Sequence, residues 1–183
     1  MVDVSEARFC LKCGSPMALR TRARAGSDPN AGSDDAEKPR AACTQCRFVY
    51  YGNPAPVAAA IVEHPQGIVL VRAAYWPEKF FGLVTGYIER DETPGDACLR
   101  EVKEELGLDG HVVSLVGVYD FRPKNELIVA YHVRATGTVT LSEENVEYKF
   151  VPVEKLRPWP FGTGDAVKDW LAQRGAVALP SEA

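Results

Sequence analysis

Three glutamates at helical spacing are the residues of this chain whose types and positions point most clearly to chemistry. Glu101, Glu104 and Glu105 stand at positions i, i+3 and i+4, so in a helix they share one face. Three carboxylates on one side repel each other, and this repulsion destabilises the helix unless a cation offsets it. Oxygen ligands of this kind suit Mg²⁺ or Mn²⁺. The alternative is the solvated acidic face of an ordinary surface helix.

The segment that carries these glutamates has the start and stop signals of a helix from Pro94 to Leu106. Thr93 can cap the first turn, and Pro94 occupies the first helical position, where its missing N–H breaks no hydrogen bond. Gly107 predicts the end of the helix. The apolar stripe expected to face the core consists of Cys98, Val102 and Leu106.

The residues around this helix resemble the Nudix box. Gly86 is followed by five residues and Glu92, and after seven more comes Arg100-Glu101-Val102-Lys103-Glu104-Glu105-Leu106-Gly107-Leu108, a match without a gap or substitution. The resemblance implies a Nudix hydrolase, with an α/β/α sandwich around a mixed sheet. Such enzymes split a nucleoside diphosphate linked to another group, by attack of a metal-activated water on phosphorus. At the entry to the box this chain has Leu83-Val84-Thr85-Gly86 where many members have Leu-Pro-Gly-Gly, so we expect its substrate contacts to differ.

The resemblance also implies roles for individual residues. Glu104 and Glu105 are expected to be direct ligands of the divalent ions, with the carbonyl of Gly86 as a further ligand. Glu101 is expected to be either a ligand or the base that accepts the proton of the water. Arg100 is expected to orient these carboxylates, together with Glu92.

A loop later in the chain often supplies the base in this family. Glu143, Glu144 and Glu147 are the candidates here. Glu147 stands just before a predicted strand and resembles that position best, against the alternative of a solvated loop charge.

Four of the five cysteines fall in two pairs, Cys10-Leu-Lys-Cys13 and Cys43-Thr-Gln-Cys46. Two such turns can offer four thiolates to a tetrahedral, structural Zn²⁺. Disulfides and unrelated core thiols are the alternatives. From Arg20 to Arg40 no apolar residue larger than alanine appears, which predicts a mobile loop. Residues 1–51 are therefore interpreted as a zinc ribbon with a mobile loop at 20–40, followed by a Nudix hydrolase domain at 52–183.

Beyond residue 52, short segments rich in β-branched residues alternate with turn signals, and two helices interrupt them. A second helix is expected from about Asp165 to Gly175. This pattern favours an α/β or α+β layered domain. The expected strands cover residues 57–63, 68–72, 83–87, 112–121, 127–135 and 148–153.

Composition and charge indicate which kinds of partner this protein binds. The 183 residues are 46% hydrophobic and 25% charged, as in ordinary globular proteins. The net charge is −4, and because residues 1–50 carry eight Lys/Arg against six Asp/Glu, the rest of the chain is acidic. An acidic domain disfavours long nucleic acids and favours divalent cations. We expect a cytoplasmic protein with a small nucleotide-like substrate and neither a long nucleic acid nor a membrane as partner. A homodimer is left open.

A zinc ribbon before a Nudix domain is similar to two subgroups, the NADH pyrophosphatases and a plant-type group of FAD pyrophosphatases. The NADH group has Gln-Pro-Trp-Pro-Phe shortly after its box, whereas here Arg157-Pro158-Trp159-Pro160-Phe161 places Trp159 51 residues beyond Leu108. We interpret this segment as a connector whose Trp159 and Phe161 fill the core. Tyr119 and Phe121 are the residues we expect to find in the substrate cleft. The expected substrate is a dinucleotide such as NADH or FAD, or ADP-ribose.

Two other classes remain open. A non-catalytic nucleotide sensor with a Nudix-like domain is one, although such domains usually have damaged boxes and every carboxylate is present here. A diphosphate isomerase of the same fold is the other, although no cysteine lies on the strand that leads into the box.

Overall fold

The computed structural model describes residues 7–20 and 39–177. The chain divides into two compact units, Met1–Asn53 and Pro54–Ala183. The mobile loop expected from Arg20 to Arg40 lies, apart from its ends, outside the described residues. Within the described part of the chain, neither helix combines the length and the apolar character needed to cross a membrane.

The first unit is a small antiparallel sheet that carries two cysteine turns. The Gly14 N–H donates to the carbonyl of Cys10 at 2.8 Å, and Gly14 has φ +71°, a conformation that a residue without Cβ adopts readily. This turn delivers the chain to the first strand. The strands, in the order in which they pair, are β1 (Met17–Arg20), β2 (Arg40–Cys43) and β3 (Val49–Tyr50).

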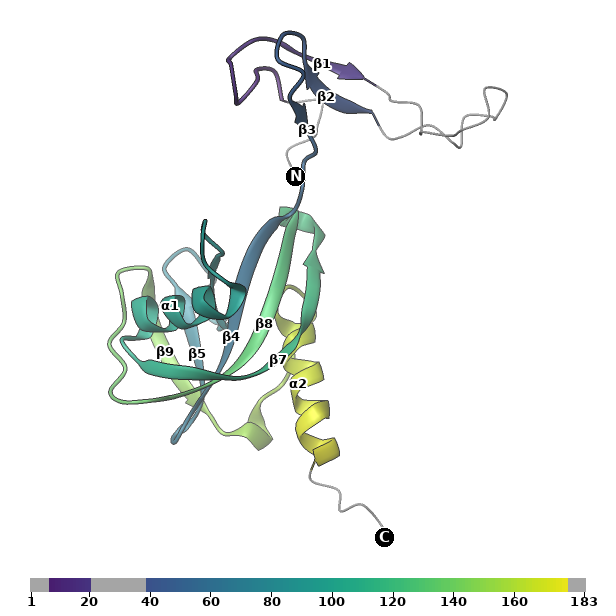
Figure 1. Cartoon of the computed structure of the whole chain (residues 1–183). Helices are drawn as coiled ribbons and strands as arrows, with labels where there is room; N and C mark the ends of the chain where they lie inside the picture. The colour runs from purple at the N-terminus through teal and green to yellow at the C-terminus, as the bar shows by residue number, and fades with distance from the viewer. Residues whose placement is uncertain (1–6, 21–38, 178–183) are drawn as a thin grey trace. The chain divides into compact units, whose positions relative to one another are not determined.

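The second unit is built on a mixed six-stranded sheet (Figure 1). Its central strand β4 pairs in parallel with β8 and antiparallel with β5 and β6. The order is β7-β8-β4-β5-β9, with β6 paired to β4 off this path. The strands are β4 (Ala55–His64), β5 (Gly67–Ala73), β6 (Val84–Tyr87), β7 (Asp109–Phe121), β8 (Glu126–Thr136) and β9 (Asn145–Val151).

Each of the six expected strands is present, but two begin three residues earlier than expected. β7 starts at Asp109 because its pairing with β8 reaches back to the Asp109–Thr136 pair, and β9 starts at Asn145 because the ladder with β5 begins there. The residues added are polar or exposed, so their apolar pattern gives no sign of a strand.

Both faces of the sheet are covered, which confirms the α/β/α sandwich. Ala58 and Ala60 of β4 pack into one core with α1 (Pro94–Leu106), whereas Ala59 and Ile61 pack into a second core with α2 (Gly164–Val177) (Figure 1). A strand buried on both faces appears in the sequence as a continuous apolar run. Successive residues of β4 therefore fix the two helices on opposite sides.

Helix α1 begins and ends as its sequence predicts. The Thr93 hydroxyl accepts a hydrogen bond from the Asp96 N–H at 3.2 Å, and a cap of this kind stabilises a helix by about 0.5–2 kcal/mol. At the other end Gly107 is left-handed, with φ 69°, and its N–H donates to the carbonyl of Lys103. Cys98 is buried on the apolar stripe, as expected.

A cluster of charged side chains around the buried His132 ties α2 to the sheet. Glu63 of β4 accepts from His132 Nε2 at 2.9 Å and from Arg134 Nε at 3.2 Å, and it pairs with Arg174 Nη2 of α2 at 2.8 Å. His132 also packs edge-on against Trp170, with ring centroids 5.3 Å apart. Burial holds the pKa of His132 below its usual range.

This histidine gives a testable pH dependence. Because the folded pKa of His132 lies below the unfolded value of about 6.5, the unfolded state takes up the proton first, and stability is lost as pH falls below about 6.5. We expect the melting temperature of the wild type to fall more between pH 7.5 and 5.5 than that of His132→Gln. Titratable groups present in both proteins affect both melting temperatures equally, so the difference between the two pH slopes reports on His132.

The exposed His111 is the matched control, and His111→Gln should keep the wild-type slope. An equal slope in His132→Gln and the wild type would show that His132 does not titrate differently in the folded state.

Candidate active site

The acidic face of α1 lies directly against strand β6. The backbone of Gly86 is so close to Glu101 that a β-carbon at this position would overlap the Glu101 carboxylate. Only glycine leaves this space, and the reason is steric rather than a positive φ. The contact places the Gly86 backbone and the Glu101 carboxylate side by side, as an ion bound to both would require.

One guanidinium organises the carboxylates of the box. Arg100 donates from Nε and Nη2 to the two oxygens of Glu92, at 3.1 and 2.8 Å. Its Nη1 contacts Glu101 at 2.6 Å and Glu104 at 3.0 Å, and its Nη2 also donates to the carbonyl of Tyr87 at 3.0 Å. The hydrogen bonds from Arg100 to Glu92 hold the pKa of Glu92 below its usual range. Arg100 thus links three carboxylates to the strand that carries Gly86.

Glu105 faces a different environment, because it is buried, with 7% of its surface exposed. The Asn145 side-chain amide donates to Glu105 Oε2 at 2.6 Å. Burial, with the charges of Glu101 and Glu144 adding to it, raises the pKa of Glu105 to about 7, although the Asn145 hydrogen bond opposes the shift. Burial also raises the pKa of Glu101. A buried carboxylate among like charges is a site where a cation is favoured.

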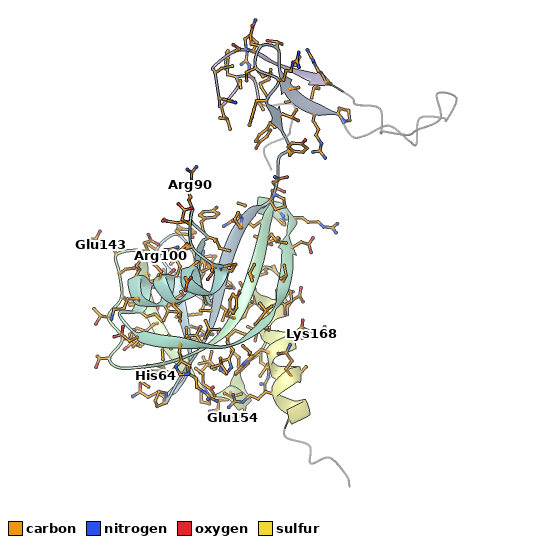
Figure 2. All side chains as sticks on the ribbon, viewed as in Figure 1. His64, Arg90, Arg100, Glu143, Glu154 and Lys168 are labelled. Carbon is orange, nitrogen blue, oxygen red and sulfur yellow. The ribbon has the colours of Figure 1, made fainter. Side chains whose placement is uncertain are left out.

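The three loop glutamates lie in different surroundings. Glu144 lines a small cavity with Glu105 and Asn145, and its charge acts on both Glu101 and Glu105. Glu147 lies on β9 and pairs with Arg72 at 3.1 Å. Figure 2 shows Glu143 extending outward from its loop, away from the labelled Arg100 of α1.

The donor set fits a divalent cation that prefers oxygen. Glu101, Glu104 and Glu105 supply carboxylates from one helix, and the backbone of Gly86 lies against Glu101. The three carboxylates do not converge on one point: Glu101 and Glu104 share Arg100, and Glu105 turns to Asn145. An ion bound between Gly86 and α1 would take over part of the neutralisation that Arg100 now supplies.

Asn145 and Thr85 are site residues that sequence reasoning missed. Asn145 donates to Glu105, and a Thr85 backbone hydrogen bond also lowers the pKa of that carboxyl. Neither has a charge or a spacing that singles it out in the sequence. Of the two residues expected in the cleft, Phe121 lines the larger cavity beside this site. Tyr119 lines neither cavity, and its hydroxyl donates to Asp169 of α2 at 2.9 Å.

The four paired cysteines gather into a second site. Their Sγ atoms lie within 4.8 Å of one another, and among the described residues they are the one such group of three or more potential ligands. The Sγ atoms of Cys13 and Cys43 are 3.5 Å apart and those of Cys10 and Cys46 are 3.6 Å apart, and none of the four forms a disulfide. A tetrahedron with metal–sulfur bonds of about 2.3 Å has edges of about 3.8 Å. The cluster therefore has the dimensions of a tetrahedral metal site.

Comparison with known proteins places the second unit in a family. The model of the NUDIX domain matches residues 53–170. The ADP-ribose pyrophosphatase of Methanocaldococcus jannaschii is 30% identical over 131 residues, which cover 68% of this chain and 78% of that protein. The NAD-capped RNA hydrolase NudC of Stutzerimonas stutzeri is 26% identical over 145 residues, 79% of this chain and 47% of that protein. The chain thus spans about half the length of that relative.

A solved structure resembles almost the whole chain. The crystal structure of a NUDIX hydrolase from Nitrosomonas europaea aligns with a TM-score of 0.73 and 22% identity, covering 92% of this chain and 93% of that one. At this identity the likeness establishes the fold.

The thiolate cluster yields a direct prediction. Cys13→Ser and Cys46→Ser should each remove the bound metal from the purified protein, because a tetrahedral site that loses one of its four thiolates binds far more weakly. Elemental analysis of the purified variants measures the metal content per chain.

Cys98→Ala is the matched control, since this thiol is buried on α1 and does not belong to the cluster. It should keep the metal content of the wild type. Full metal content in Cys13→Ser would show that the four thiolates do not hold an ion.

Proposed function

The chain belongs to the NUDIX domain family, and from this premise we propose that it is a metal-dependent hydrolase of nucleoside diphosphates linked to another group. The observation that carries the proposal is the acidic face of α1, held over Gly86 by Arg100 inside the family-matched residues 53–170. The names of two relatives support this proposal: one is an ADP-ribose pyrophosphatase and the other an NAD-capped RNA hydrolase. The bond cleaved would be the diphosphate linkage.

We assign Glu104 and Glu105 as ligands of Mg²⁺ or Mn²⁺, with the Gly86 carbonyl and Glu101 beside them. When bound, such ions lower the pKa of water and neutralise charge on the phosphoryl oxygens. The role of the chain's own residues is then to position the oxygen atoms that bind the ions. Arg100 does this by fixing Glu101 and Glu104 against the strand that carries Gly86.

We propose Glu144 as the loop carboxylate that accepts the proton of the attacking water. It lines the small cavity next to Glu105, whereas Glu147, favoured by the sequence, is engaged by Arg72. A general base must come within hydrogen-bond reach of the proton it removes, directly or through one water. Glu144 meets this condition better because it shares this cavity with Glu105.

We propose further that the substrate is a dinucleotide such as NADH or FAD, or ADP-ribose. The diphosphate linkage in each of these joins a nucleoside to a second group, as the names of the relatives also suggest for their substrates. Residues 1–51 would form a zinc ribbon with a structural Zn²⁺, and residues 52–183 the hydrolase domain. Free paired thiols suit a reducing compartment, which supports a cytoplasmic location.

The assignment predicts the effect of two conservative substitutions. Glu104→Gln and Glu105→Gln should keep the fold and lower kcat/KM by about a hundredfold or more, because each replaces a charged ligand by a neutral amide. The measurement is product analysis with Mg²⁺ or Mn²⁺ and NADH, NAD, FAD or ADP-ribose, in which a dinucleotide should yield two monophosphates.

The exposed Glu154 provides the control, and Glu154→Gln should retain wild-type activity. Full activity of Glu104→Gln or Glu105→Gln would overturn the metal assignment. Binding of these nucleotides by the wild type without turnover would instead identify a sensor.

The identity of the base is tested by comparing two loop variants. Glu144→Gln should lower kcat by about 10²–10⁴-fold, the usual contribution of side-chain acid–base catalysis, whereas Glu147→Gln should change it by only a few-fold. The pH profile of kcat, measured at saturating metal, should lose its acidic limb in Glu144→Gln alone. The reverse result would assign the base to Glu147.

A further inference from the structure

A cavity of about 330 Å³ lies next to the acidic site and is lined mainly by apolar side chains. Trp76, Leu83 and Thr85 line both this cavity and the small one that contains Glu105 and Glu144. Its volume falls in the range of about 300–1,000 Å³ that is usual for small-molecule sites. A molecule whose phosphates lie at Glu105 could therefore extend directly into it.

Four aromatic side chains form one wall of this cavity, and we call them the aromatic wall: Trp76, Phe80, Trp159 and Phe161. Phe80 lies at the centre, with ring centroids 5.1 Å from Trp76, 6.0 Å from Trp159 and 5.1 Å from Phe161. Two of these rings come from the segment before β6 and two from the segment before α2. The wall thus joins parts of the chain about 80 residues apart in the printed sequence.

The aromatic wall is fixed by close packing before any ligand arrives. A β-carbon on Gly82 would lie 2.9 Å from the ring of Trp76, and a β-carbon on Gly164 would overlap the carbonyl of Trp159. Trp159 also packs against the core beneath α2. A preformed wall requires little ordering when a ligand binds, which favours affinity.

Phe161 is different because it is 49% exposed although it lines the cavity. The sequence interpretation that Trp159 and Phe161 fill the core therefore holds for Trp159 and is wrong for Phe161. A large aromatic side chain left half open to solvent beside a cavity has apolar surface still to bury.

Two charged residues at the cavity restrict what it can recognise. The Glu126 side chain is 10% exposed and accepts from the Tyr87 hydroxyl at 3.3 Å, while Lys124 Nζ lies 4.0 Å away. An ionised carboxylate only accepts hydrogen bonds, so it favours a partner that donates N–H or O–H. Lys124 is the one cationic residue among those that line the cavity, which makes the cavity a poor site for a polyphosphate.

We propose that this cavity binds the flat heteroaromatic ring of the substrate, stacked on the aromatic wall, and that Glu126 selects rings with an exocyclic amine such as adenine. The idea rests on the proposed function for the position of the phosphates at Glu105. Phe161 then supplies the stacking surface, and Glu126 supplies the acceptor for the amine. Stacking of a base on an aromatic side chain tolerates any base, so the discrimination between bases falls to Glu126.

Titration of tryptophan fluorescence tests the stacking, because Trp76 and Trp159 both line the cavity. The probes are AMP and ribose 5-phosphate, which differ only by the adenine ring. Mg²⁺ is added so that the carboxylates do not repel the phosphate, and neither probe has a diphosphate linkage to cleave. AMP should quench the fluorescence and ribose 5-phosphate should not. Phe161→Ala should weaken AMP binding by about tenfold, since alanine substitution at a base-stacking position costs about 1–3 kcal/mol.

The matched control is Tyr148→Ala, which removes an aromatic side chain of similar exposure on β9, outside the cavity. It should bind AMP as the wild type does. Equal quenching by ribose 5-phosphate, or unchanged AMP affinity in Phe161→Ala, would overturn the ring site. Thermal melting confirms that each variant is folded.

The selection of the amine is tested with IMP, whose ring has a carbonyl where adenine has its amine. The wild type should bind AMP at least several-fold more tightly than IMP, and Glu126→Gln should lose this preference because an amide can both donate and accept. An unchanged AMP preference in Glu126→Gln would remove this residue from the recognition of the ring.

Failure of this inference and failure of the proposed function give different results. Ring-dependent AMP binding with no hydrolysis of any diphosphate would leave the ring site in place and remove the hydrolase. Hydrolysis with AMP affinity insensitive to Phe161→Ala would do the opposite.

Discussion

The guanidinium of Arg100 is the charge on which the acidic face of α1 depends. It contacts Glu92, Glu101 and Glu104 within 2.6–3.1 Å and also donates to the carbonyl of Tyr87. Without it, carboxylates on successive turns of one helix would repel each other and turn apart into solvent. Because one planar cation meets all of them, the direction of each carboxylate follows from the position of a single side chain. Glu105 is the exception, since it is fixed by burial and by Asn145.

The fold supports this arrangement by fixing the position of α1 on the sheet. The Thr93 cap and the left-handed Gly107 set where the helix begins and ends, and Cys98, Val102 and Leu106 press it onto β4. Gly86 then allows β6 to approach the helix more closely than any other residue would. The absence of a side chain at Gly86 thus lets the backbone of β6 lie against the Glu101 carboxylate. The opposite face of the sheet is filled by α2, so the platform is packed on both sides.

Much of this could be predicted from the sequence, because the signals involved are local. Helix caps, glutamate spacing and paired cysteines depend on residues a few positions apart, and β-branched runs mark the strands. What escaped prediction depends on pairing across the chain. The partners of Glu147 and Tyr119, Arg72 and Asp169, are 75 and 50 residues away. The exposure of Phe161 depends on the shape of a cavity that two distant loops create together.

The parallel pairing of β4 with β8 has a consequence for how the molecule assembles. It joins Ala55 to Glu126 and Glu63 to Arg134, so the strand beneath the acidic helix acquires this neighbour only after all of α1 and β7 have been made. Such long-range parallel contacts close large loops and form slowly, whereas the β4–β5 hairpin and α1 rest on local contacts that form fast. During synthesis the edge of β4 that will pair with β8 therefore remains unpaired until β8 has been made. The interval is one in which contact with another nascent chain competes with folding.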